Sequence, residues 1–137
     1  MELALSTANP HKAREITDIA AGLSLRIVTC ADFPGYVPPE ETGKNFRDNA
    51  ALKAVSFGRV AGLPCLADDS GLEVPALGGR PGVRSARYAG SDGDYRANNE
   101  KLLRAMEGLT PGRRGAAFTC VMALFDPAES LIEWHGI

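Results

Sequence analysis

The sequence has few of the residues that build disulfide frameworks and small metal centres. It contains three cysteines and two histidines in 137 residues. Cys30, Cys65 and Cys120 are widely spaced within apolar runs, a pattern typical of reduced cysteines in a protein core. His11 opens a predicted helix, and His135 lies near the end of the chain. The sequence therefore predicts neither a disulfide framework nor a zinc site, and it offers no Ser/His/Asp or Cys/His arrangement.

Long hydrophobic runs and an excess of one charge are also absent. No apolar stretch approaches the roughly 18 residues of a membrane span, and Met1 and Glu2 lead into a predicted strand without the basic segment of a signal peptide. The formal net charge of −2 at pH 7 predicts no binding of nucleic acid or of an anionic membrane. We therefore expect a cytoplasmic protein.

The composition that remains is that of a globular protein, with 45% hydrophobic and 23% charged residues. Its length predicts a single domain over residues 1–137. Sequence patterns predict strands at 2–7, 25–30, 63–68, 114–126 and 130–137, and helices at 10–22, 43–61 and 95–109. Because strands alternate with helices, we expect an α/β fold with a mixed central sheet flanked by helices.

Apolar spacing predicts which side of each helix is buried. The first helix has a stripe of Ile16, Ile19, Ala20 and Leu23; the second of Phe46, Ala50, Ala54, Phe57 and Ala61; the third a seam of Tyr95, Asn99, Leu102, Met106 and Leu109. The strand at 63–68 is apolar and predicts burial on both faces, with a turn before 71–74. The run 114–126 predicts a long buried strand.

Residues 6–12, with the sequence S-T-A-N-P-H-K, join the first strand to the first helix. Unpaired backbone N–H groups and the positive end of the helix dipole favour an anion there. Thr7 and Asn9 add donors and Lys12 adds a positive charge. Capping of the helix by Asn9, with Lys12 in solvent, explains the same residues. Neither a Walker A loop nor G-x-G-x-x-G is present.

Asp68 and Asp69 are adjacent carboxylates at the end of the strand at 63–68. They repel each other and resist burial unless a cation compensates them. In open α/β sheets, ligands collect beyond the carboxyl ends of strands, which is also where the loop at 6–12 lies. Carboxylates together with phosphate oxygens suit Mg²⁺, so this edge of the sheet predicts a magnesium site.

Other charged residues can also be explained without a functional site. Glu40 and Glu41 precede the second helix, where the helix dipole alone would stabilise them. Lys53 either directs its amine towards the site or lies in solvent at the edge of the apolar stripe. Arg80, Arg84 and Arg87 lie on the loop at 78–94 and either reach phosphates or remain solvated.

Four blocks together resemble a known family. They are S-T-A-N-P-H-K, E-E-T-G-K-N-F-x-x-N-A-x-x-K-A, A-D-D-S-G-L-E-V-x-A-L-G-G-x-P-G-V-x-S-A-R-Y and R-x-A-x-F-x-C-V. The sequence is similar, from residue 3 to about 136, to the inosine/xanthosine triphosphate pyrophosphatases. The resemblance implies a Mg²⁺-dependent hydrolase that converts dITP, ITP and XTP to the monophosphate and pyrophosphate. It also implies a homodimer that clears deaminated purines from the nucleotide pool.

The resemblance assigns roles to individual residues. Asp69 would hold Mg²⁺ and activate water, with Asp68 beside it and Glu41 (or Glu40) completing the metal site. Ser70 would contact substrate and Lys53 would neutralise phosphate charge. The triphosphate would be cradled by Thr7, Ala8, Asn9, Pro10, His11 and Lys12.

The family pattern is not complete in this sequence. Family members continue with a G-F-G-Y-D-P segment and a late S-H-R segment that grip the purine base, and neither occurs here. We therefore expect the phosphate-binding and metal-binding half of a site in a C-terminally truncated domain. Two alternatives remain: a Maf-type nucleotide pyrophosphatase, and a non-catalytic nucleotide-binding or dimerisation module.

Overall fold

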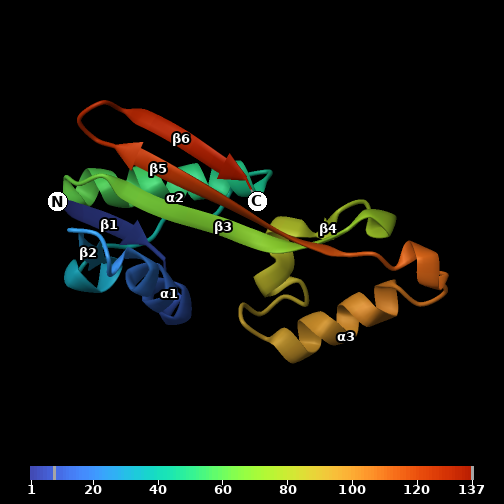
Figure 1. The fold of residues 1–137 in the computed structure, drawn as a ribbon. Helices are drawn as coiled ribbons and strands as arrows, with labels where there is room; N and C mark the ends of the chain where they lie inside the picture. Colours follow the sequence, from blue (N-terminus) through green and yellow to red (C-terminus); the bar gives the residue numbers. More distant parts are fainter. Residues whose placement is uncertain (8, 137) are drawn as a thin grey trace.

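In the computed structural model of the chain, which describes residues 1–7 and 9–136, the strands form one mixed sheet. The strand order is β2-β1-β3-β5-β6, and the short strand β4 pairs with β3 at its far end (Figure 1). The strands are β1 Glu2–Ser6, β2 Arg26–Thr29, β3 Cys65–Val74, β4 Arg80–Pro81, β5 Ala117–Asp126 and β6 Leu131–Gly136. The predicted mixed sheet with flanking helices is confirmed.

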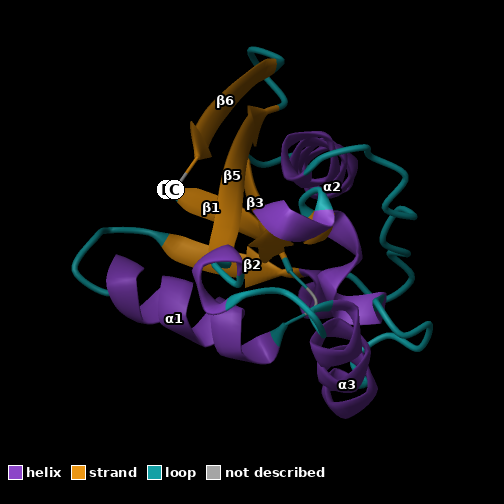
Figure 2. Cartoon of the chain, turned by 90° about the vertical axis from the view of Figure 1, so that its right-hand side faces the viewer, coloured by secondary structure: helices purple, strands orange, loops and turns teal. Residues whose placement is uncertain are grey.

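The helices lie on both sides of this sheet. β1 is parallel to β2 and to β3, whereas β5 is antiparallel to β3 and to β6. The chain steps from β1 to β2 in one direction and from β2 to β3 in the other, so right-handed crossovers place α1 (Pro10–Ala20) and α2 (Phe46–Ala61) on opposite faces (Figure 2). The third helix, α3 (Tyr95–Ala105), lies beyond the sheet near the far end of β3.

The predicted turn after the strand at 63–68 is wrong, because β3 continues without a break for ten residues. β5 pairs with it along the whole stretch, from Cys65 opposite Phe125 to Glu73 opposite Ala117. A ladder of this length supplies backbone partners that a turn would lose. β1 ends at Ser6, opposite Ala67 of β3, so β3 carries the next residues past the carboxyl end of β1.

The helix α2 covers β1, β3 and β5 and packs Ala50 and Ala54 against the core residues of β3 and β5. It begins at Phe46, three residues later than predicted, because the Asn45 side chain accepts a hydrogen bond from the Asp48 N–H and caps it. Gly62, with φ of 66°, ends it in the left-handed conformation that glycine adopts readily. The predicted stripe is confirmed at four buried positions, Phe46, Ala50, Ala54 and Phe57.

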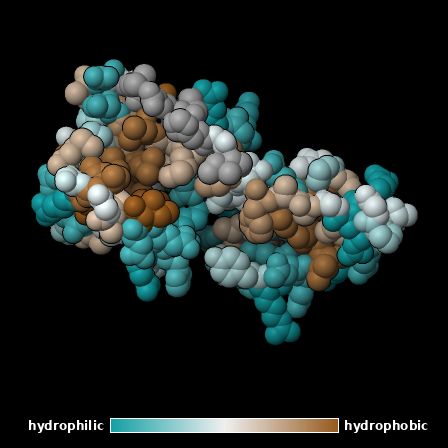
Figure 3. All heavy atoms as spheres, in the orientation of Figure 1, coloured by the Kyte–Doolittle hydropathy of each residue, from teal (hydrophilic) through white to brown (hydrophobic). Residues whose placement is uncertain are grey.

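The first helix begins as predicted but packs less than predicted. The Asn9 side chain accepts from the N–H groups of His11 and Lys12, and Pro10 takes the first helical position. Of the predicted stripe only Ala20 is buried, and Ile19 is 82% exposed. The apolar spacing therefore overstated the contact of this helix with the sheet. Hydrophobic residues are visible at the surface on the near side of the molecule (Figure 3).

The third helix and β5 also differ from expectation. The helix ends at Ala105 instead of residue 109, and it buries Asn98 while the predicted seam residue Tyr95 is 70% exposed. Phe118 in β5 is 81% exposed, so only the second half of this strand is buried. Both elements extend beyond the part of the sheet that α2 covers (Figure 1), and Tyr95 and Phe118 are largely exposed.

The described residues contain no helix long and apolar enough to span a membrane. The three cysteines are free, as predicted: Cys65 is buried and the other two are half-buried. Burial raises the pKa of the Cys65 thiol to about 12, which keeps it protonated and unreactive.

Phe57 is the residue on which the inner face of α2 depends most. It is fully buried, and the rings of Phe33 and Tyr36 lie 5.3 and 4.9 Å from its ring. We expect Phe57→Ala to lower the free energy of unfolding by about 3–5 kcal/mol in urea denaturation. Val60→Ala on the same helix, at a 55% exposed position, is the control and should stay within about 0.5 kcal/mol. Equal effects of the two substitutions would contradict this account of the core.

Candidate active site

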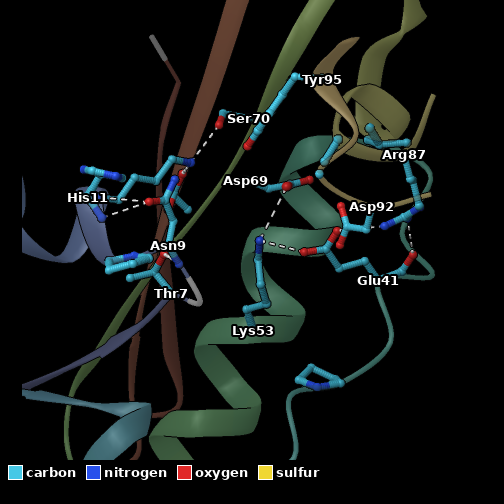
Figure 4. Close-up of a pocket in the computed structure, with 17 residues that line it drawn as sticks. Thr7, Asn9, His11, Glu41, Lys53, Asp69, Ser70, Arg87, Asp92 and Tyr95 are labelled. Atoms are coloured by element: carbon cyan, nitrogen blue, oxygen red, sulfur yellow. Dashed lines mark hydrogen bonds and ion pairs between the residues drawn. The ribbon is translucent and has the colours of Figure 1, made fainter. Parts of the chain in front are cut away.

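A cleft of about 770 Å³ opens where β3 passes the carboxyl end of β1 (Figure 4). Its walls come from the start of α1, the loop before α2, the middle of β3 and the segment between β4 and α3. The prediction that the loop at 6–12 and the carboxylate pair share one crevice agrees with this arrangement. β1 ends at the cleft, whereas β3 continues past it.

The start of α1 contributes backbone and a lysine to the cleft. The Asn9 side-chain oxygen is occupied by helix capping, at 2.9 Å from the His11 nitrogen, and Thr7 Oγ1 accepts from the Asn9 N–H at 3.2 Å. Lys12 Nζ donates to Asp68 Oδ2 and, at 2.8 Å, to Ser70 Oγ. Pro10 lines the cleft with these residues, whereas Ala8 lies outside the described residues. Helix capping and a cleft-facing lysine, which looked like alternatives, therefore occur together.

The second carboxylate, Asp69, faces the other side of β3. Its Oδ2 accepts from Asn49 Nδ2 at 3.1 Å, and its Oδ1 lies 3.4 Å from Lys53 Nζ. The same lysine donates to Glu41 Oε1 at 3.0 Å. Lys53 is therefore not solvated at the helix edge. Its ammonium group lies between two carboxylates inside the cleft (Figure 4).

The backbone of β3 explains how two neighbouring aspartates tolerate burial. Successive side chains of a strand point to opposite faces, so Asp68 points towards α1 and Asp69 towards α2. Each carboxylate has its own lysine, Lys12 for the first and Lys53 for the second. Burial raises the pKa of Asp69, and the Lys53 charge and the Asn49 hydrogen bond offset this only in part.

Of the two candidate glutamates, Glu41 belongs to the site. Glu40 is exposed, while Glu41 is half-buried against Lys53 and lines the cleft. Arg87 Nη1 lies 3.5 Å from Glu41 Oε2, and Arg87 Nη2 donates to the Glu41 carbonyl oxygen at 3.4 Å. Of the three loop arginines, Arg87 is the one that lines the cleft.

Hydrogen bonds from Asn98 hold the segment between β4 and α3, which carries Arg87. The Asn98 side chain donates to the Ala86 carbonyl at 2.9 Å and accepts from the Ala89 N–H at 2.6 Å, so it brackets the arginine. The same segment packs directly on β3. A Cβ on Gly71 of β3 would lie only 2.5 Å from Gly82 O, so the two backbones are in close contact. The sequence patterns assigned no role to Asn98 or to Asn49. Their common signal is a buried amide, which a sequence alone does not show.

The donor set can be tested against a divalent cation. Among residues 1–7 and 9–136, no group of three His, Cys, Asp or Glu side chains is close enough to form a complete protein metal centre. Glu41 and Asp69 nevertheless converge on one positive charge, the Lys53 ammonium. Two carboxylates facing one cation position, beside space for a phosphate, are the donors from which Mg²⁺ sites of nucleotide enzymes are usually built. The residues fit a site that substrate oxygens complete.

The fold and this cleft define an α/β protein with cationic and acidic side chains gathered at the carboxyl end of a strand beside a helix start. The Ham1 family model matches residues 3–137, and the chain belongs to the Ham1 family. It is 45% identical to the dITP/XTP pyrophosphatase of Thioalkalivibrio sulfidiphilus, over 99% of this chain and 72% of that protein. It is 48% identical to that of Listeria monocytogenes, over 98% of this chain and 66% of that protein.

A solved structure agrees with the fold. The crystal structure of the nucleoside-triphosphatase, or dITP/XTP pyrophosphatase, from Mycobacterium abscessus superposes with a TM-score of 0.86 at 39% identity. The match covers all of this chain and 71% of that one. The chain therefore spans about two thirds of the length of the curated relatives that it matches.

Proposed function

We propose that the chain hydrolyses the deaminated purine nucleotides dITP, ITP and XTP to the monophosphate and pyrophosphate, with Mg²⁺ as cofactor. The observation that carries the proposal is the pairing of Lys12 with Asp68 and of Lys53 with Asp69 and Glu41 around one cleft. Relatives at 45–48% identity are named dITP/XTP pyrophosphatases, which supports the choice of substrates. A cytoplasmic homodimer that cleans the nucleotide pool is part of the same proposal and rests on the resemblance.

The cleft residues divide the work of binding a triphosphate. Lys12, with the N–H groups at the start of α1, attracts phosphate oxygens, because the helix end and the ammonium group are both positive. Lys53 and Arg87 supply positive charge from the opposite wall. Ser70 Oγ, which accepts from Lys12, retains a hydroxyl proton to donate to substrate. Pro10 and His11 contribute the wall of the cleft.

Asp69 is the group that we assign to the water. The reaction breaks the anhydride bond between the α and β phosphates, adds water, and leaves a monophosphate and pyrophosphate. Asp69 Oδ1 accepts the proton of the attacking water, since Oδ2 is already bonded to Asn49.

Glu41 and Asp69 are the residues that would hold Mg²⁺, and Asp68 lies on the other face of β3 with Lys12. When bound, the metal neutralises charge on the phosphate oxygens and favours departure of pyrophosphate. Binding would move the Lys53 ammonium off the two carboxylates and free it for a phosphate oxygen. Lys53 would thereby serve as counter-charge before binding and as phosphate ligand afterwards.

Pyrophosphate release by the 137-residue chain tests the proposal. We expect Mg²⁺-dependent release from dITP, ITP and XTP, and much slower release from dATP and dTTP. Faster turnover of dTTP than of dITP would favour the Maf-type alternative. Binding of dITP without any release, by a folded sample, would refute the hydrolase proposal and favour a nucleotide-binding module.

A further inference from the structure

Asn49 is a fully buried polar residue in the first turn of α2, behind the cleft. A buried amide is unfavourable in an apolar helix face unless its donors and acceptor are bonded. Neighbouring positions on the same face are occupied by Phe46, Ala50 and Ala54, which need no such partners. The presence of an amide at this position therefore requires an explanation from the residues that it touches.

The two bonds of Asn49 define which way its amide points. The Gly43 N–H donates to Asn49 Oδ1 at 2.7 Å. Because a backbone N–H can only donate, the atom facing it must be the amide oxygen, and the NH₂ group must face the opposite way. That group donates to Asp69 Oδ2 at 3.1 Å. The loop backbone thus orients the amide, and the amide contacts the carboxylate.

The consequence for Asp69 is that its two oxygens are not equivalent. Oδ2 is held by Asn49 on the buried side, and Oδ1 faces Lys53 and Glu41. We propose that Asn49 is a positioning residue that binds Asp69 Oδ2 so that Oδ1 alone is presented to the cation position and to water. The proposal rests on the function proposed above, in which Asp69 does the chemistry.

Gly43 helps to orient the Asn49 side chain. A Cβ at Gly43 would lie 2.8 Å from Asp48 Cβ and would also collide with Asn49 Oδ1, so the loop can donate this N–H only if residue 43 has no side chain. Gly43 is not among the residues that line the cleft, and its N–H bonds to Asn49. Substituting it therefore acts on Asn49 without replacing a residue that lines the cleft.

The first test compares Asn49→Asp with wild type. Aspartate has nearly the same shape and can still accept from Gly43, but it turns an acceptor towards Asp69 Oδ2 in place of a donor. We expect kcat for dITP to fall about 10- to 100-fold and the Mg²⁺ dissociation constant, measured by calorimetry without nucleotide, to rise by a similar factor. We expect KM for dITP to change less than about threefold, because Asn49 does not line the cleft.

Asn45→Ala is the matched control. Asn45 caps the same helix and also uses its side-chain oxygen to accept from a backbone N–H, that of Asp48, and it is not among the residues that line the cleft. Its substitution should lower the unfolding temperature while kcat and Mg²⁺ affinity stay at wild-type values. A loss of kcat equal to that of Asn49→Asp would mean that any damage to this helix start suffices, and would overturn the proposal.

Gly43→Ala keeps the test decisive if Asn49→Asp does not fold. It should lower kcat and Mg²⁺ affinity in the same direction with a smaller effect. Wild-type kcat and Mg²⁺ affinity in folded Asn49→Asp, or in Gly43→Ala where Asn49→Asp is unfolded, would overturn the proposal. Absence of turnover in the wild-type chain would instead refute the proposed function, and Mg²⁺ affinity would then decide on Asn49 alone.

Discussion

Asp69→Asn should lower Mg²⁺-dependent pyrophosphate release from dITP by about 10³- to 10⁴-fold. Asparagine can still accept from Asn49, so the side chain keeps its place, but it cannot take a proton from water and binds a cation weakly. Steady-state kinetics with a coupled pyrophosphate assay measures the effect. Binding of dITP should weaken far less than turnover, because Lys12 and the start of α1 remain intact. Turnover within about tenfold of wild type would remove Asp69 from the mechanism.

The same variant should be more stable than wild type at neutral pH in the absence of metal. Burial raises the pKa of Asp69 in the folded chain above its ordinary value of 3.8, so folding favours the protonated carboxyl. At about pH 7 the ionised carboxylate therefore lowers the free energy of unfolding of the wild type. This loss shrinks as the pH falls through the pKa of the folded chain, and it vanishes below the pKa of the unfolded chain. We expect a gain of about 3–5 °C at about pH 7, the shift that ~1 kcal/mol produces in a domain of this size. A gain that persists unchanged at about pH 4 would contradict this origin.

Lys53→Met should have the second-largest effect, on both stability and turnover. It removes the ammonium group that lies between Glu41 and Asp69 and leaves these two partly buried carboxylates facing each other. We expect a loss of about 2 kcal/mol, less than for a fully buried pair because the Lys53 side chain is 17% exposed. Thermal unfolding in EDTA measures this loss. The value of kcat/KM should fall about 100-fold.

Addition of Mg²⁺ makes this prediction specific to the proposed metal position. If the metal binds Glu41 and Asp69, it replaces the missing ammonium charge and should restore part of the stability of Lys53→Met. The matched control is Lys12→Met, which removes the counter-charge of Asp68 on the opposite face of β3. Mg²⁺ should restore little of its stability. Stronger rescue of Lys12→Met than of Lys53→Met would place the metal at Asp68 instead.

The predictions that depended on near neighbours in sequence agree best with the structure. The capping of α1 by Asn9, the stripe on α2, and the alternation of strands and helices follow from interactions within a few residues. The order of residues along the chain predicts such local interactions directly. Where the amount of burial mattered, as for Ile19 in α1 and Phe118 in β5, periodicity identified an apolar side chain but not whether a partner element covers it.

The sequence by itself determined the residue types of the site and the strand and helix start on which they lie. The tertiary structure decided how their charges are paired, because the partners are far apart along the chain. Lys12 and Asp68 are 56 residues apart, and Arg87 and Glu41 are 46 apart. The uninterrupted pairing of β3 with β5 turned two neighbouring aspartates to opposite faces, which no local pattern indicates. Only that register assigned Asp68 to Lys12, and Asp69 to Lys53 and Asn49, since a strand presents alternate side chains to different packing layers.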